Sequence, residues 1–292
     1  MLYTNESKFE VMAMKLIADS GSTTTDWALV ESTDVRYFKT EGISPYFHSD
    51  QQIQAILHEQ LKPQCKDASP ASIHFYGTGC ASASNADKIK SRLSVLFPAA
   101  AITVEHDLLG AARALCGRSP AIACILGTGS NSCAYDGDHI TENRPGLGFI
   151  LGDEGSGAHL GKQLIARYLY GDLDKTLADQ FTHSYGLTKD LILDRVYRQP
   201  LANRFLAGFA PFLAQNRGNG QVEQIVRESF GAFVNGHIAR YALSRSLPVH
   251  ATGSIAAAFS DVLINTLTEA GLQAGQILKT PMDGLVRFHT GS

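Results

Sequence analysis

The sequence predicts an α/β protein built from two similar halves. Apolar segments at residues 14–19 and 122–126 are typical of β-strands. Each runs into a short turn rich in glycine, serine and threonine, which is followed by a second strand. The chain has 292 residues, of which 44% are hydrophobic. It is therefore long enough to form two domains or one large α/β domain.

The first half opens as a meander of strands and continues with helices. Ile53, Ile56, Leu57 and Leu61 recur at the spacing of one helical face, which predicts a helix over residues 50–61. Further strands are expected at residues 27–30, 35–38, 72–76 and 102–104, and further helices at residues 83–96 and 108–116.

The second half repeats this opening and becomes mostly helical after residue 156. The dipeptide Asp136-Gly137 predicts a tight hairpin turn. A long apolar stripe predicts a helix over residues 221–242, whose apolar side chains we expect in the core. Further strands are expected at residues 132–135, 248–252 and 276–279, and further helices at residues 255–259 and 283–288.

The boundary between the two lobes is expected near residues 118–120, where the pattern restarts. This gives an N-terminal lobe over residues 1–118 and a C-terminal lobe over residues 119–282. The terminal helix near residues 283–289 is expected to pack back on the first lobe. Residues 1–13 are mixed polar and lack the apolar region of a signal peptide, so we interpret them as a loose extension.

Composition excludes several classes of function. The net charge is −3, from 25 basic and 28 acidic residues, so no basic excess indicates nucleic acid and no polybasic segment indicates a membrane partner. The five cysteines are an odd number and form no CxxC pair, which disfavours a disulfide framework or a zinc site. These features favour a reducing, cytoplasmic location.

The two turns carry the first indication of chemistry. Residues 19–26 read DSGSTTTD and residues 127–132 read GTGSNS. Glycine lets backbone N–H groups approach an oxyanion closely, so the pair is compatible with a phosphate chain held from two sides. Asp19 ends the first strand, where a carboxylate can hold Mg²⁺ directly or through water. For either turn alone, an ordinary hairpin is the alternative.

These motifs carry a resemblance to a known superfamily. The segments DSGSTTTDW, ILGTGSNS and ATGSIAAAF resemble the phosphate-1, phosphate-2 and adenosine motifs of the sugar kinase, Hsp70 and actin ATPases. The segment LGFILGDEGSG at residues 147–157 resembles the GDEGS segment of the N-acetylglucosamine kinase-like branch, which includes the BadF/BadG/BcrA/BcrD ATPases. The resemblance covers residue 14 to the C-terminus. It implies two ribonuclease H-like lobes of the actin-like ATPase type, with a nucleotide cleft between them.

The resemblance implies ATP and Mg²⁺ as cofactors, with Asp19 as the metal-binding residue. The sequence contains no GxxxxGK[ST] motif, so a P-loop is excluded as the source of nucleotide binding. The residues that approach ATP would come from all three motifs: Gly21, Ser22 and Thr23; Gly127, Thr128, Gly129 and Ser130; and Gly253, Ser254 and Ala256.

Asp107 is the candidate general base. It stands where a strand ends and a helix begins, in the segment DLLGA, and resembles the family's aspartate that takes a proton from the attacking sugar hydroxyl. Aspartate is also a favoured helix N-cap, so capping is the alternative role, and one residue can perform both.

The sugar side departs from the family pattern. Related kinases present an asparagine where this chain has Gly42-Ile43-Ser44-Pro45-Tyr46-Phe47, and a tryptophan where Leu147 stands. The candidate substrate-binding residues are Ser44, Tyr46, Gly77, Gly146, Gly148 and Asp153. A solvated acidic loop that caps the following helix is the alternative for Asp153. The segment Gly77-Thr78-Gly79 either adds hydroxyl contacts or forms a plain turn.

The resemblance implies ATP-dependent phosphorylation of an amino sugar, with N-acetylglucosamine and its 6-hydroxyl as the leading expectation. A BadF-type ATPase activator of a partner enzyme is one alternative, although no cysteine lies in a glycine-rich loop suited to an iron–sulfur cluster. A non-catalytic sensor of ATP or sugar is the other. The resemblance also implies a homodimer.

Overall fold

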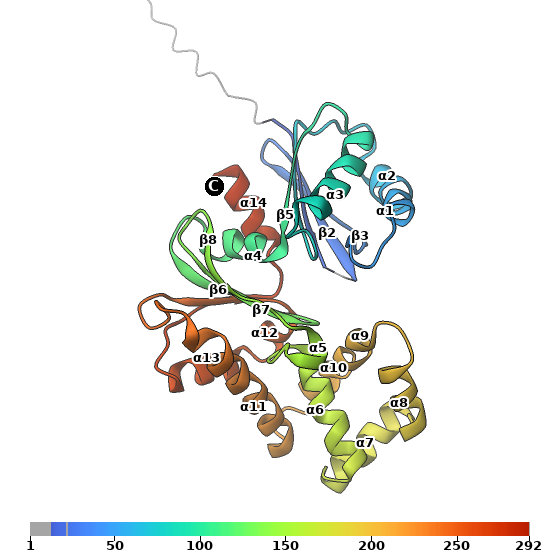
Figure 1. Cartoon of the computed structure of the whole chain (residues 1–292), viewed down its shortest axis with the longest axis vertical. Helices are drawn as coiled ribbons and strands as arrows, with labels where there is room; N and C mark the ends of the chain where they lie inside the picture. The colour runs from blue at the N-terminus through green and yellow to red at the C-terminus, as the bar shows by residue number, and fades with distance from the viewer. Residues whose placement is uncertain (1–12, 22, 292) are drawn as a thin grey trace, which may run out of the picture. The chain divides into compact units, whose positions relative to one another are not determined.

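The computed structural model describes residues 13–21 and 23–291, and these divide into two compact units (Figure 1). Unit 1 comprises the described residues up to Gly110 together with the segment from Met282 onward, and unit 2 spans Ala111–Pro281. The extension expected at residues 1–13 lies outside the described residues except for its last position. Each unit is considered by itself.

Unit 1 is a five-stranded mixed sheet with helices on both faces. Its strands are β1 (Lys15–Ser20), β2 (Thr24–Glu31), β3 (Asp34–Glu41), β4 (Ser72–Gly77) and β5 (Ala101–His106). Its helical elements are α1 (Asp50–Ile56), the π-helical η1 (Leu57–Leu61), α2 (Lys62–Cys65), α3 (Ala83–Leu96) and α14 (Met282–Thr290), and α4 (Asp107–Cys116) begins in it.

The sheet of unit 1 has the order β3-β2-β1-β4-β5, in which β1 runs antiparallel to β2 and parallel to β4. Alternate side chains of β1 face opposite sides of the sheet. Leu16 and Ala18 join the apolar cluster that includes Ile53 of α1 and Leu93 of α3. On α14, the backbone carbonyl of His289 accepts a hydrogen bond from Lys15 of β1.

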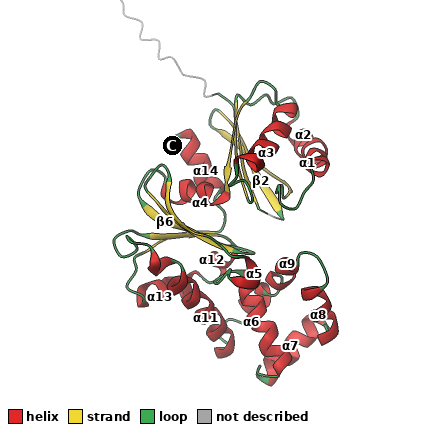
Figure 2. Ribbon diagram, in the orientation of Figure 1, coloured by secondary structure: helices red, strands yellow, loops and turns green. Residues whose placement is uncertain are grey.

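Unit 2 is a second five-stranded mixed sheet, with a long helical stretch inserted between its third and fourth strands in chain order (Figure 2). Its strands are β6 (Ala121–Leu126), β7 (Ser130–Tyr135), β8 (Ile140–Arg144), β9 (Val249–Thr252) and β10 (Ala274–Leu278). Its helices are α5 (Gly148–Leu151), α6 (Gly157–Tyr170), α7 (Lys175–Tyr185), α8 (Lys189–Tyr197), α9 (Ala202–Ala207), α10 (Ala210–Gln215), α11 (Gly220–Gly236), the 3₁₀ turn η2 (Ile238–Arg240), α12 (Ser254–Ala258) and α13 (Ser260–Glu269).

The second sheet repeats the topology of the first. Read from its antiparallel edge its order is β8-β7-β6-β9-β10, so β6 takes the place of β1 and β9 the place of β4. The apolar stripe of α11, which includes Val222, Phe230 and Phe233, is buried in the core of this unit. The predicted internal repeat is therefore a repeat of strand order, although the sequences of the halves differ.

Two elements differ from the sequence prediction. The helix expected over residues 221–242 ends at Gly236, and the chain continues as a 3₁₀ turn that still buries Ile238. Strand β8 was implied by the predicted hairpin turn at Asp136-Gly137 but received no bounds, because four of its five residues are polar or charged and exposed. It is a strand because its backbone pairs with β7.

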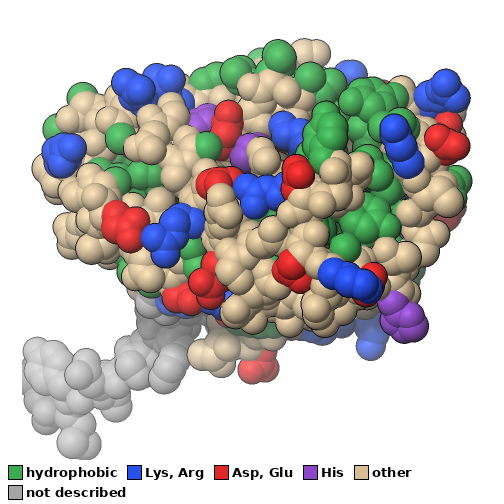
Figure 3. All heavy atoms as spheres, turned by 90° about the horizontal axis from the view of Figure 1, so that it is seen from below, with side chains coloured by type: hydrophobic (Ala, Val, Ile, Leu, Met, Phe, Trp, Pro, Cys, Tyr) green, Lys and Arg blue, Asp and Glu red, His purple; other side chains and the backbone are tan. Residues whose placement is uncertain are grey.

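Acidic and basic side chains are interspersed on the face of the molecule shown in Figure 3. Among the described residues, no helix combines the length and apolar character needed to span a bilayer.

Candidate functional site

The candidate site of unit 1 lies where three neighbouring strands end. The register pairs Asp19 of β1 with Tyr76 of β4, and Gly77 of β4 with His106 of β5. Because these strands are parallel, their carboxyl ends share one edge of the sheet, which is where α/β proteins bind ligands. Asp19, Thr78 and Asp107 follow one another along this edge.

Both carboxylate oxygens of Asp107 accept hydrogen bonds. The hydroxyl of Thr78 donates to Oδ2 at 2.6 Å, and the backbone N–H of Leu108 donates to Oδ1 at 2.9 Å. Asp107 is the first residue of α4, and its side chain bonds the N–H of the next residue rather than that of the second or third helical residue, which a helix N-cap bonds. Each oxygen keeps a further lone pair, so this arrangement leaves the proposed basic role open.

Asp19 is held in an unfavourable electrostatic environment. Burial, and secondarily the nearby carboxylates of Asp107 and Asp26, raise its pKa from 3.8 to about 7. The described residues contain no cluster of three histidine, cysteine or acidic ligands that could hold a metal alone. Asp26 is ion-paired with Lys39 at 2.8 Å, so the carboxylates of Asp19 and Asp107 carry the negative charge that remains here. Such a pair suits Mg²⁺, which takes one or two protein carboxylates and completes its shell with water and phosphate.

The phosphate-1 turn and the loop after β3 are tied together by Ser20. Its hydroxyl is fully buried, accepts from the N–H of Ile43 at 2.9 Å and bonds the hydroxyl of Thr25 at 2.7 Å. Gly21 closes the turn through its N–H to the carbonyl of Thr24 at 3.0 Å. Thr23 is exposed. Ser22, predicted to contact phosphate, lies outside the described residues.

The structure brings together Ser44, Tyr46 and Gly79. Ser44 is buried, whereas Tyr46 is 66% exposed and lies with its ring against Gly79. Gly79 has φ +88°, and a Cβ there would come within 2.6 Å of the Tyr46 ring. Gly77 is also constrained, since a Cβ there would meet the ring of Phe75. The substrate residues predicted in this unit thus lie on two adjoining loops.

In unit 2 the phosphate-2 turn is fixed to the start of α6. The N–H of Gly157 donates to the carbonyl of Gly127 at 2.8 Å, and the N–H of Ala158 donates to that of Thr128 at 3.1 Å. Gly253 has φ +122°, and a Cβ there would clash with the carbonyl oxygen of Leu126. Only glycine therefore allows the adenosine motif to pack against the phosphate-2 turn.

These segments line a cavity of about 280 Å³ within unit 2. Three of its lining residues, Gly127, Thr128 and Ser254, were predicted to bind nucleotide. Ala256, also predicted, is fully buried in the core, and the cavity is lined by its helical neighbours Ile255 and Ala258. This follows from the helical period, since residues 254, 255 and 258 share one face of α12.

Gly253→Ala is expected to lower the free energy of unfolding by about 3 kcal/mol or more, because it combines an unfavourable φ with a steric clash. Gly218→Ala is the matched control, because Gly218 has φ +93° but no atom within 4 Å of its Cβ position. It should cost only about 1–2 kcal/mol. Denaturant unfolding measures both, and equal losses would refute the argument from steric fit.

The carboxylate of Asp153 is enclosed by the predicted sugar loop and the phosphate-2 turn. It is 7% exposed and accepts hydrogen bonds from the backbone N–H groups of Ser130 and Gly148. Cβ atoms built on Gly129 and Gly146 would lie 2.9 and 3.3 Å from its two oxygens. Burial raises the pKa of this carboxyl although both hydrogen bonds lower it. The N–H groups that bond Asp153 belong to unit 2, as Asp153 itself does. The alternative of a solvated acidic loop did not anticipate these hydrogen bonds.

Helix α11 anchors the segment that follows Asp153, which itself has φ +57°. Nε2 of His237 lies 3.2 Å from a carboxylate oxygen of Glu154. The hydroxyl of Ser229 accepts from the N–H of Gly155 at 3.1 Å and lies 2.7 Å from Nδ1 of His159. Glu154 is therefore an anchoring residue in this structure.

Two buried hydroxyls in these motifs have no hydrogen-bond partner among the described residues, those of Ser130 and Thr252. Buried polar groups are normally satisfied, so unpartnered ones are expected where a ligand or water binds. Ser130 was predicted as a phosphate ligand, whereas Thr252, directly before Gly253, was not.

Sequence reasoning missed the far wall of the cavity beside Gly127, Thr128 and Ser254. It is formed by Ala207, Ala210, Pro211, Ala214 and Phe259. Small apolar residues in helices carry no chemical signal in a sequence, and only tertiary packing brings α9 and α10 to this place.

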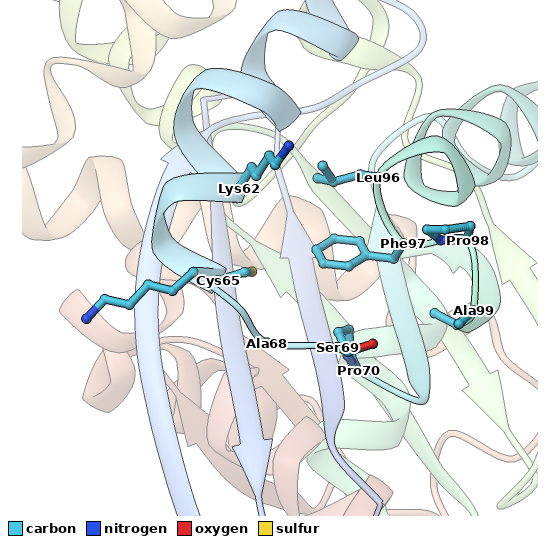
Figure 4. Close-up of a pocket in the computed structure, with 11 residues that line it drawn as sticks. Lys62, Cys65, Ala68, Ser69, Pro70, Leu96, Phe97, Pro98 and Ala99 are labelled. Carbon is cyan, nitrogen blue, oxygen red and sulfur yellow. The ribbon is translucent and has the colours of Figure 1, made fainter.

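A second cavity, of about 180 Å³, lies in unit 1 between the ends of α2 and α3 (Figure 4). Lys62 and Phe97 line it, together with the loop that precedes β4. It is therefore at the amino ends of β4 and β5, the opposite edge of the sheet from Asp107.

Comparison with solved structures gives full-length likenesses. A putative N-acetylglucosamine kinase from Porphyromonas gingivalis is 42% identical, with a TM-score of 0.92, over 96% of this chain and 99% of that one. A putative N-acetylglucosamine kinase from Chromobacterium violaceum is 22% identical, with a TM-score of 0.72, over 94% and 98%. A ROK family glucokinase from Streptomyces griseus, solved with glucose and AMPPNP, is 13% identical, with a TM-score of 0.56, over 96% and 99%. No protein-family model and no curated protein matches the chain.

The repeated five-stranded sheets and the full-length likenesses define a sugar kinase of the two-lobed actin-like ATPase fold, which confirms the predicted fold class. The chain belongs to the N-acetylglucosamine kinase family, on the strength of its 42% identity to the Porphyromonas gingivalis protein over nearly the whole of both chains.

Proposed function

We propose that this sugar kinase transfers the γ-phosphoryl group of ATP, with Mg²⁺, to the 6-hydroxyl of N-acetylglucosamine. The observation that carries the proposal is the row of Asp19, Thr78 and Asp107 at the ends of three neighbouring strands, with Asp107 bonded at both oxygens. Family membership and the names of the related structures support the choice of sugar.

In this proposal Asp107 orients the acceptor hydroxyl and receives its proton. Phosphoryl transfer depends mainly on alignment and charge stabilisation, so a carboxylate fixed by two hydrogen bonds suits the role. The remaining lone pairs of Asp107 are free to accept from the sugar.

The nucleotide would bind unit 2. The cavity lined by Gly127, Thr128 and Ser254 lies at the start of α12, whose first N–H groups have no helical partner and would suit phosphate oxygens, and it has an apolar wall for the adenine base. The Streptomyces griseus glucokinase, which shares the fold, was solved with AMPPNP, and this supports ATP as the nucleotide. Mg²⁺ would be held through Asp19 and would offset the negative charge of the phosphates.

The acceptor would be contacted by Asp153 with Gly146 and Gly148, and by Ser44, Tyr46 and Gly77. Asp153 keeps lone pairs beyond its two backbone hydrogen bonds, which leaves it able to accept from sugar hydroxyls. The ring of Tyr46 offers an apolar surface of the kind that sugar rings stack against.

ADP release from Mg-ATP tests the proposal, measured with N-acetylglucosamine, glucosamine, N-acetylmannosamine, a muramic-type sugar and glucose. The expected result is sugar-dependent ADP formation that is highest with N-acetylglucosamine. Highest turnover with another sugar would correct the substrate, and ADP formation without any sugar dependence would favour an ATPase with a protein partner.

No observation favours the BadF-type alternative. Four of the five free cysteines are buried, where their thiols are not presented to a cluster shared with a second subunit. The five free cysteines support a cytoplasmic location. A homodimer stays a prediction, which sedimentation velocity would test.

A further inference from the structure

The side chain of Thr78 is hydrogen-bonded to the candidate base, Asp107. Its hydroxyl donates to Oδ2 of Asp107 at 2.6 Å, the short distance typical of a hydroxyl bonded to a carboxylate. The bond joins residues 29 positions apart and from different strand ends. No local rule of turn geometry requires it.

Thr78 is itself held in place by its surroundings. Its backbone N–H donates to the carbonyl of Ser20 at 2.9 Å, which ties it to the end of β1 beside Asp19. Gly77 and Gly79 on either side leave no room for a Cβ, since neighbouring rings occupy that space. The hydroxyl therefore presents a fixed donor to Asp107.

Without the hydroxyl of Thr78, the carboxylate of Asp107 is expected to move. Asp19 lies close enough that the two carboxylates repel each other. The N–H of Leu108 restrains only Oδ1 of Asp107. The Asp107 side chain is therefore free to rotate about its χ angles, which would carry Oδ2 away from the hydroxyl of the acceptor sugar. A displacement of about 1 Å in a reacting group can cost about 100-fold in rate.

We infer that Thr78 is a positioning residue, whose hydroxyl holds Asp107 in the rotamer that aligns a sugar hydroxyl with the phosphoryl donor. The inference rests on the proposed function and assigns to it a residue beyond those expected from the family motifs. The competing interpretation is that Thr78 is a turn residue whose bond to Asp107 is incidental.

Thr78→Val keeps the shape of the side chain and removes its hydroxyl, whereas Thr78→Ser keeps the hydroxyl. Thr78→Val is expected to lower kcat by about 10–100-fold with the sugar KM within about threefold of wild type. Thr78→Ser should recover kcat to within about fivefold. Thr103→Val is the matched control, because it removes a threonine hydroxyl bonded to His74 at 2.9 Å in the same sheet, and it should leave kcat within about twofold.

A double-mutant cycle with Asp107→Asn tests whether Thr78 acts through Asp107. If it does, adding Thr78→Val to Asp107→Asn changes the residual kcat by less than about twofold. A full additional loss in that background, or an unchanged kcat in Thr78→Val alone, would overturn the inference.

Crystal structures of the two Thr78 variants give a readout that needs no substrate. Asp107 should leave its rotamer, or occupy two, in Thr78→Val and keep it in Thr78→Ser. An unmoved Asp107 in Thr78→Val contradicts the inference even if no sugar proves to be a substrate. The wild-type protein could show no sugar-dependent activity while Asp107 is displaced in Thr78→Val. This result would count against the proposed function and not against the positioning role of Thr78.

Discussion

Asp107→Asn is expected to lower kcat for sugar phosphorylation by about 10²–10⁴-fold, the usual contribution of a general base. Asparagine has nearly the same shape, and its amide oxygen can still accept from Thr78 or Leu108. The variant therefore removes the proton acceptor and its charge with little change in structure. Initial rates at saturating Mg-ATP and sugar measure the loss.

Nucleotide affinity distinguishes loss of chemistry from loss of structure. The nucleotide cavity is lined by residues of unit 2, whereas Asp107 belongs to unit 1, so the Kd of AMPPNP should stay within about twofold. Glu105→Gln, two residues earlier on β5, makes the same change of formal charge and should retain nearly full activity. Asp107→Asn with more than a tenth of the wild-type kcat would leave Asp107 a helix-terminal residue only.

Much of the fold could be predicted because its signals are local. The strand at β1 and its equivalent at β6 are uninterrupted apolar runs that end in glycine-rich turns, and both were expected within one or two residues of their observed bounds. Strand β8 has no such signal, since its stability comes from pairing with β7. Pairing partners are a tertiary property that an isolated segment does not encode.

The same distinction applies to the site. Asp19 and Asp107 could be singled out because each is a carboxylate at the end of an apolar strand. The hydrogen bond from Thr78 to Asp107 could not be predicted, because it depends on β4 lying between β1 and β5 in the sheet. The order of residues along the chain does not show that β4 lies beside both β1 and β5. The α10 wall of the nucleotide cavity was missed for the same reason.

Asp19→Asn is expected to stabilise the protein at alkaline pH while it abolishes kinase activity. The pKa of Asp19 rises from 3.8 to about 7 in the folded state, so the folded protein binds the proton of this carboxyl more tightly than the unfolded chain does. The wild-type protein therefore loses stability as the pH rises from about 4 to about 7, and carries the full penalty above that. The gap between the two pKa values corresponds to at most about 4 kcal/mol. Because Asp19 keeps some contact with solvent, we expect asparagine to gain about 2–4 kcal/mol at pH 8.5.

Denaturant unfolding at two pH values tests the sign of this effect. The gain should shrink to about 1 kcal/mol or less at pH 4.5, where Asp19 is protonated in the folded protein. Asp34→Asn, at an exposed position of the same unit, is the control and should change stability by less than about 0.5 kcal/mol at either pH. A variant less stable than wild type at pH 8.5 would mean that the ionised carboxylate makes favourable contacts, contrary to the raised pKa.

Titration with Mg²⁺ in the absence of nucleotide connects the stability effect of Asp19 to its proposed function. If Asp19 binds the cation, Mg²⁺ at about tenfold its Kd should stabilise the wild-type protein at pH 8.5 by about 1.4 kcal/mol and leave Asp19→Asn unchanged. The cation would then offset the same repulsion that asparagine removes. The gain in stability from Mg²⁺ and the gain from Asp19→Asn should therefore not add. A carboxylate that lowers the stability of the folded protein is the kind of feature expected at a functional site, and the proposed binding of Mg²⁺ would account for it. Equal stabilisation of both proteins by Mg²⁺ would place the metal elsewhere.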